Sequence, residues 1–199
     1  MNRRLLSALF RGAVGAGSLA ALLVPGPGAR EAWAQSVPDR ISALEVRTRF
    51  LADLDTLQKK FLALAEAIPA EKYSWRPGEG VRSVGEAFMH VASEYYVFTP
   101  MAWGAAPSPV VGRGREAFQK FEGMSSKPEV MKHLGEAFAF MKQAVSGVDA
   151  AAITGPQNLF GGQRTIIETS FIMSGDLHEH LGQLIAYSRM LGVKPPWSQ

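Results

Sequence analysis

Residues 175–184, GDLHEHLGQL, lie within a segment from Thr165 to Leu191 whose apolar residues recur at helical spacing. Thr165 and Glu168 have the spacing of a capping box at its start, and Gly192 is a suitable residue for its end. The segment is therefore expected to form the last helix. One face should pack on a core, and a polar stripe should lie beside that face, formed by Asp176, His180, Gln183 and Tyr187.

The polar stripe contains a potential pair of metal ligands. Asp176 and His180 are four residues apart, so their Cβ atoms should lie about 5–6 Å from each other on one helix face. His178 is two residues from His180, so it should point to roughly the opposite side and be exposed. A further ligand must come from another helix, and His90 is the best candidate. Spacing alone favours the alternative that these residues are simply solvated.

Three earlier segments also predict helices. Residues 42–68 have a long amphipathic pattern, and Ser83 with Glu86 forms a second capping box before a helix that should run to roughly Phe98 and stop at Pro100. A third segment begins near Ser126 or Lys127, and its apolar stripe extends to Val145. Residues 103–114 and 150–165 are expected to be connections without strands. The sequence therefore predicts an all-α protein, a four-helix bundle.

The polar side chains near His90 and on the third helix complete the set of candidates. Glu94 lies one turn after His90, where it could act as a catalytic base or accept the imidazole N–H, or could be an ordinary exposed glutamate. His133 lies one step off the apolar stripe of the third helix and is expected at the surface. Tyr73 and Trp75 are expected to hold their loop against the core.

The first 34 residues have the features of a cleavable secretory signal. Two arginines precede a mostly apolar stretch to Val24, and Ala32-Trp33-Ala34 is a suitable cleavage site before Gln35. We therefore expect a signal peptide at 1–34, one domain at 35–199, and a periplasmic or secreted protein. A Sec signal is favoured over the twin-arginine type. The alternative is an uncleaved N-terminal anchor, although Arg11 makes a stable transmembrane span unfavourable.

Charge and cysteine content exclude several functional classes. Four arginines and one glutamate lie within residues 1–34, so cleavage would leave 17 basic and 17 acidic side chains and reduce the net charge from +3 to zero. A nucleic-acid partner therefore has no electrostatic support. The chain contains no cysteine, which excludes disulfides, a cysteine nucleophile and thiolate metal ligands.

Several short motifs occur in an order and at spacings that together are fairly specific. They are Trp75-Arg76-Pro77-Gly78, Ser83 followed by His90-Val91-Ala92-Ser93-Glu94, His180-Leu181-Gly182-Gln183-Leu184, and Tyr187-Ser188-Arg189-Met190 followed by Gly192-Val193-Lys194-Pro195-Pro196. Across about residues 45–196 the chain resembles the DinB-like family of four-helix bundles, which includes thiol transferases. The resemblance implies a divalent metal held by three histidines. His90 and His180 match two of those positions, and Asp176 stands where the middle histidine is expected.

The resemblance leads to a functional expectation with alternatives. Asp176 could replace the missing histidine as a ligand to one divalent transition metal, zinc, nickel, iron or manganese, or it could mark a site that has decayed. Gln183 and Tyr187 could orient a small-molecule substrate. A metal-dependent hydrolase is the first hypothesis, and a thiol-transferase-like enzyme is the second. A non-catalytic bundle for metal binding or protein contact in the cell envelope is the alternative, and a homodimer is a further hypothesis.

Overall fold

The computed structural model describes residues 40–149, 152–154, 157–159 and 162–198. Four long helices dominate this part of the chain: α2 (Arg40–Ala67), α3 (Val84–Trp103), α5 (Lys127–Gly147) and α6 (Ile166–Met190). A short helix, α4 (Arg115–Gly123), follows the loop after α3. The expected helical class and the four long helices are confirmed. The predicted signal peptide lies outside the described residues.

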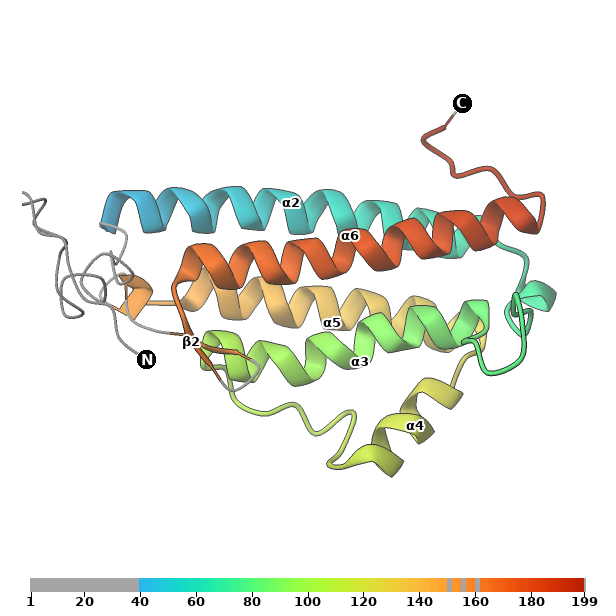
Figure 1. The fold of residues 1–199 in the computed structure, drawn as a ribbon, viewed down its shortest axis with the longest axis horizontal. Helices are drawn as coiled ribbons and strands as arrows, with labels where there is room; N and C mark the ends of the chain where they lie inside the picture. Colours follow the sequence, from blue (N-terminus) through green and yellow to red (C-terminus); the bar gives the residue numbers. More distant parts are fainter. Residues whose placement is uncertain (1–39, 150–151, 155–156, 160–161, 199) are drawn as a thin grey trace, which may run out of the picture. The chain divides into compact units, whose positions relative to one another are not determined.

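The four long helices lie side by side (Figure 1). Helix α2 packs against α5 and α6, and α3 packs against the same two helices, so α2 and α3 occupy opposite corners of the bundle. The apolar residues predicted for the first helix form part of the core, and Leu54, Leu57 and Phe61 are fully buried. Burial of such side chains contributes about 1.5–3 kcal/mol each, and this burial is what holds the helices together.

Both predicted capping boxes are present. The Ser83 hydroxyl accepts a hydrogen bond from the Glu86 N–H at 3.2 Å, and the Glu86 carboxylate accepts one from the Ser83 N–H at 2.7 Å. Thr165 and Glu168 form the same pair of hydrogen bonds at the start of α6. Each box satisfies N–H groups that have no partner within the helix. These local interactions fix where α3 and α6 begin.

Helix α3 does not end at Pro100, contrary to the prediction. It continues to Trp103 and ends at Gly104, which has the left-handed conformation with φ +66°. The Trp103 ring is buried, stacks on Phe50 at 5.6 Å between ring centroids, and donates a hydrogen bond to the Met173 sulfur. Proline removes one hydrogen bond from the last turns of the helix, and the burial of Trp103 outweighs that loss.

Helix α4 was not predicted, and the surface position predicted for His133 is wrong. Phe121 of α4 is buried and lies 4.8 Å from the His133 ring, which is itself only 6% exposed. The Tyr96 ring of α3 lies against both of them, at 6.0 Å from Phe121 and 6.3 Å from His133. Helix α4 therefore packs over a part of α5 that is predicted to be exposed when the sequence of α5 is considered alone.

The connection before α6 contains two short strands, β1 (Gln157–Leu159) and β2 (Gly162–Arg164), which pair antiparallel. Strands of three residues are too short to show an alternating pattern, so the prediction of a connection without strands was wrong here. Short 3₁₀ turns occur at Ala70–Lys72 and Ala152–Thr154. Among the described residues, no helix has both the length and the apolar character that crossing a bilayer requires.

Tyr73 and Trp75, in the loop between α2 and α3, are attached to the core as predicted. The Tyr73 hydroxyl donates a hydrogen bond to the Ala65 carbonyl at 2.6 Å, and its ring stacks on Phe88. The Trp75 ring contacts the edge of Tyr187 on α6. This end of the bundle is therefore fixed by aromatic contacts between α3, α6 and the loop that precedes α3.

Candidate metal centre

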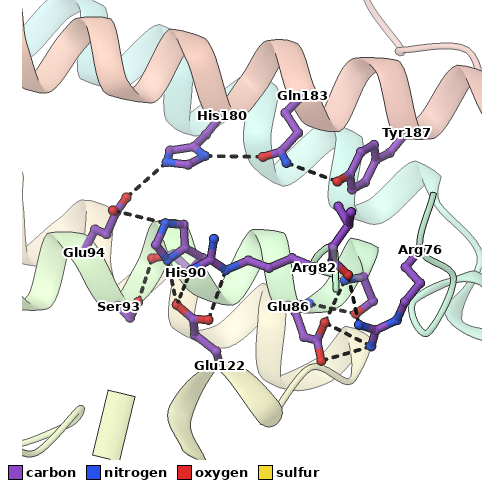
Figure 2. Close-up of polar contacts among 12 residues, drawn as sticks. Arg76, Arg82, Glu86, His90, Ser93, Glu94, Glu122, His180, Gln183 and Tyr187 are labelled. Carbon is purple, nitrogen blue, oxygen red and sulfur yellow. Dashed lines mark hydrogen bonds and ion pairs between the residues drawn. The ribbon is translucent and has the colours of Figure 1, made fainter. Parts of the chain in front are cut away.

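His90, Glu94 and His180 meet between α3 and α6. His90 Nε2 lies 3.1 Å from Glu94 Oε1, and His180 Nε2 lies 3.2 Å from Glu94 Oε2, so one carboxylate bridges two imidazoles (Figure 2). The centroids of the two imidazole rings are 5.0 Å apart. One ligand atom from each residue lies within 4.8 Å of the other two. His90 and Glu94, one helical turn apart on α3, thus face His180 of α6, a helix that is distant in sequence.

The chemistry of this group fits a divalent metal ion. The side chains of His90 and Glu94 are each 13% exposed and that of His180 is 19% exposed, so the donors are shielded but still reachable. Glu94 Oε2 is buried, and its 3.2 Å contact with His180 Nε2 leaves a second lone pair of that oxygen available. Two imidazole nitrogens and a carboxylate oxygen are ligands used for zinc and for other transition metals. The described residues therefore contain a cluster that could hold a metal.

Asp176, the predicted middle ligand, lies beside this cluster. Its Oδ1 is 3.6 Å from His180 Nε2, and its Oδ2 is 3.4 Å from the Tyr95 hydroxyl, which donates a hydrogen bond to it. Its side chain is 34% exposed, more than the three clustered side chains. The structure thus brings Glu94 to the third position of the cluster and places Asp176 at its edge. The ligand role of Asp176 stays a prediction.

Glu122 of α4 is a contact of His90 that the sequence analysis missed. His90 Nδ1 donates to Glu122 Oε1 at 2.6 Å, and Glu122 also accepts a hydrogen bond from Arg82 Nε at 3.1 Å. A carboxylate on one ring nitrogen fixes the orientation of an imidazole and directs the other nitrogen outward, here toward Glu94. The apolar spacing of Phe118 and Phe121 could have indicated α4, but no local signal connects Glu122 with His90.

The charges in the cluster stabilise one another. Burial alone would lower the pKa of His90, but hydrogen bonds to Glu122 and Glu94 outweigh it and raise that pKa to about 9. Burial would raise the pKa of Glu94, but the hydrogen bonds from His180 and His90 lower it to about 2. The hydrogen bond to Glu94 raises the pKa of His180. Without metal, the His90 imidazole is therefore protonated at neutral pH and paired with carboxylates, and the contact with Glu94 favours the protonated form of His180.

The pKa of Asp176 shifts in the opposite direction to that of Glu94. Burial raises it, and the nearby negative charge of Glu94 raises it further. The two carboxylates thus differ in both exposure and acidity. Glu94 is the enclosed, strongly acidic carboxyl between the imidazoles, and Asp176 is the more exposed and more basic carboxyl beside them.

Gln183 and Tyr187 extend the network along α6 (Figure 2). His180 Nδ1 lies 3.5 Å from Gln183 Oε1, and Gln183 Nε2 donates a hydrogen bond to the Tyr187 hydroxyl at 3.1 Å. Gln183 therefore helps to orient the His180 ring. The substrate-binding role of both residues stays a prediction. The side chain of His178 is 52% exposed and lies near Asp53, as expected for a residue outside the cluster.

Comparison with known proteins identifies the family. A model described as the DinB superfamily matches residues 53–184, a range that includes His90, Glu94 and His180. A DinB-like protein from Bacillus subtilis is similar in structure, with a TM-score of 0.56, 16% identity, and coverage of 72% of this chain and 92% of that chain.

A second similar structure supports the same fold. A DinB-like protein from Bacillus cereus ATCC 10987 has a TM-score of 0.56 and 13% identity, and the match covers 74% of this chain and 93% of that chain. No curated protein matches the chain. At such low identity the two structures support the fold alone, whereas the family model covers most of the sequence. The chain therefore belongs to the DinB superfamily.

Proposed function

We propose that this protein binds one divalent transition metal ion through His90, Glu94 and His180. The observation that carries the proposal is the convergence of three ligand atoms within 4.8 Å, contributed by two helices. Two imidazoles from α3 and α6, bridged by an enclosed carboxylate, are stronger support for a metal site than ligand spacing along a single helix. Zinc, nickel, iron and manganese all accept this set of ligands.

The structure supports different roles for the two carboxylates. Glu94 faces both imidazoles and is enclosed, which suits a ligand, and this role replaces that of a base in the original hypothesis. Asp176 lies at the edge of the cluster and is partly exposed, which suits a group that accepts a proton from a bound water or substrate. A metal bound here would act as a Lewis acid and lower the pKa of a coordinated water or thiol.

The reaction class is proposed from the chemistry of these groups. A site with three protein ligands and a neighbouring carboxylate supports a hydrolase first and a thiol-transferase-like enzyme second. We also propose that residues 1–34 direct export and are removed, because they have the charge, apolar stretch and cleavage site of a signal peptide. A low-molecular-weight thiol that is abundant in the cytosol would then be a less suitable substrate.

Metal content tests the binding site. Protein purified without an affinity tag is expected to retain about one equivalent of zinc after reconstitution and dialysis, as three-ligand sites do. His90→Ala, His180→Ala and Glu94→Gln should lose it, whereas Asp176→Asn should retain it. Metal retained by Glu94→Gln but lost from Asp176→Asn would return the ligand role to Asp176. Little metal in the unmodified protein with any of the four ions would contradict the proposal.

Turnover tests the enzyme hypothesis separately. Zinc-loaded protein is assayed for hydrolysis of para-nitrophenyl acetate and for transfer of a thiol to chlorodinitrobenzene. We expect metal-dependent turnover in one assay and its loss in Asp176→Asn with metal content unchanged. Metal binding without turnover in either assay would favour the non-catalytic bundle. The intact mass of the exported protein tests cleavage before Gln35, and light scattering tests the homodimer hypothesis.

A further inference from the structure

A cavity of about 550 Å³ lies beside the metal centre, on the side of α4. It is lined by α4, by the loop before it, by Arg82 and by Val97 of α3. The lining residues that matter for its chemistry are Arg82, Val97, Arg113, Arg115, Phe118 and Glu122. The volume is within the range of small-molecule pockets.

The cavity shares two residues with the surroundings of the metal centre. Glu122 lines the cavity and accepts the 2.6 Å hydrogen bond from His90 Nδ1. Phe118 also lines it, and its ring lies edge-on to the His90 imidazole at 6.2 Å between centroids. The side chains of Glu122 and Phe118, which both contact the His90 ring, lie between that ring and the cavity. A small molecule held there would lie next to one ligand of the proposed metal.

The charges of the cavity are unbalanced. Arg82 is neutralised by Glu122, with nitrogen to oxygen distances of 3.1 and 3.4 Å. Arg113 and Arg115 are exposed, and neither forms an ion pair with any residue in the described part of the chain. Two guanidinium groups beside one wall of a cavity, without carboxylate partners, attract an anion and can bind it through two parallel hydrogen bonds each.

The backbone beside these arginines turns tightly where the loop meets α4. Gly112 and Gly114 flank Arg113 with φ +81° and +85°, a conformation that other residues rarely adopt. At Gly112 an added Cβ would lie 3.1 Å from the Cβ of Ala117, so the loop folds closely onto α4. Val97 and Phe118 provide an apolar wall. The cavity thus combines a cationic rim with a surface suited to an apolar group.

We infer that this cavity binds the acidic group of a small substrate, a carboxylate or a phosphate monoester attached to an apolar body. The inference rests on the proposed function, since it names the class of substrate that the metal centre would receive. Arg113 and Arg115 bind the anion, and Phe118 and Val97 contact the apolar part. Arg82 and Glu122 are paired with each other, so the anion is bound by the two guanidinium groups that have no carboxylate partner among the described residues.

Fluorine NMR titration of the whole protein tests this inference. The probes are para-fluorobenzoate, para-fluorophenyl phosphate and para-fluorobenzamide, the last being an uncharged match for the first. The double variant Arg113→Gln/Arg115→Gln is compared with Arg49→Gln/Arg189→Gln, which removes the same charge from exposed positions on α2 and α6. Each titration is carried out with EDTA and again with bound zinc.

We expect at least one anionic probe to bind the unmodified protein without metal, and to bind more tightly than the amide. The cavity variant should lose about tenfold or more of that affinity, whereas the matched variant should lose little. The inference is overturned if the amide binds equally well, if both variants behave alike, or if no probe binds. Binding that needs zinc and survives in the cavity variant would also overturn it. If the protein binds the anionic probe but takes up no metal, the inference about the cavity stands and only the proposed metal site is refuted.

Discussion

His90 and His133 have similar local sequences and different surroundings. Each lies on a long helix of the bundle, and each has glutamates about one turn away: Glu94 for His90, and Glu129 and Glu136 for His133. The His133 ring nitrogens lie 3.3 Å from Glu129 and 3.6 Å from Glu136. Local spacing alone would therefore assign both histidines the same role.

Contacts from other helices separate the two. His90 faces a second histidine from α6 and a carboxylate from α4, and its glutamate partners are 12% and 13% exposed. His133 faces the rings of Phe121 and Tyr96, and its glutamate partners are 44% and 50% exposed. Packing thus makes one histidine a candidate ligand and the other part of an aromatic cluster.

The largest effect that can test this contrast is stabilisation by metal. Zinc bound only to the native state should raise the free energy of unfolding by about 4 kcal/mol at a free concentration one thousand times its Kd. His180→Ala should lose this increment, whereas His133→Ala should keep it, although its baseline stability is lower. Urea unfolding with and without zinc measures the increment in each protein. An equal loss of the zinc-dependent stabilisation in both variants would contradict the different roles assigned to the metal cluster and to His133.

The bundle could be predicted because its signals are local. The capping boxes at Ser83 and Thr165 and the apolar stripes each lie within one segment, and the structure confirms them. Pro100 was misjudged because its local effect is opposed by the burial of Trp103 against Phe50 and Met173, which are distant in sequence.

The site could be predicted only in part, for the same reason. His90 and His180 were found from helical spacing and from the family resemblance, and the structure brings them together. The enclosure of Glu94 depends on the arrival of α6, and the contact of Glu122 with His90 depends on the docking of α4. Neither of these two contacts can be deduced from residue spacing along one helix. Such spacing shows which residues share a helix face, but it does not show which other helix packs against that face.

The second prediction concerns pH and the raised pKa of His90, about 9. A protonated imidazole cannot bind metal, so binding must release its proton. Below that pKa, zinc affinity should fall by about tenfold for each pH unit through His90 alone, or about a hundredfold between pH 8 and pH 6. Calorimetry in buffers of different ionisation enthalpy measures the protons released. Zinc affinity that does not change over this range would contradict the pairing of His90 with its two carboxylates.

Without metal, the same group should produce the opposite pH dependence. A pKa raised in the folded state stabilises the protein below the unfolded value, and that contribution is lost as the pH rises from 6.5 toward about 9. The lowered pKa of Glu94 stabilises the protein above 4.5, and its contribution is lost as the pH falls toward about 2. Urea unfolding in EDTA should show the alkaline loss in the unmodified protein and a reduced loss in His90→Gln.

A smaller effect should identify His133 as a packing residue. Replacing it with alanine leaves a cavity between Phe121 and Tyr96 and should cost about 2 kcal/mol, at the lower end for large-to-small core substitutions. His178→Ala is the matched control, because that side chain is 52% exposed, and it should change stability by less than about 0.5 kcal/mol. Both are measured by urea unfolding in EDTA. Equal costs would show that the aromatic contacts of His133 contribute little.

The smallest effect should come from Glu122, which contacts the proposed metal ligand His90 without belonging to the cluster. Glu122→Gln keeps the size of the side chain but removes the charge that orients the imidazole, and should weaken zinc binding by about tenfold. Glu129→Gln makes the same change beside His133 and should leave zinc affinity unchanged. Competition with a chromophoric chelator measures both.

Arg82→Gln separates the two contacts of Glu122. It removes the ion pair with Glu122 while leaving the 2.6 Å hydrogen bond between Glu122 and His90. If Glu122 acts by orienting His90, zinc affinity should fall more in Glu122→Gln than in Arg82→Gln. Equal losses would mean that the ion pair between Arg82 and α4 matters more than the orientation of the ring. The distinction between His90 and His133 would then depend on the docking of α4 as a whole, rather than on one carboxylate.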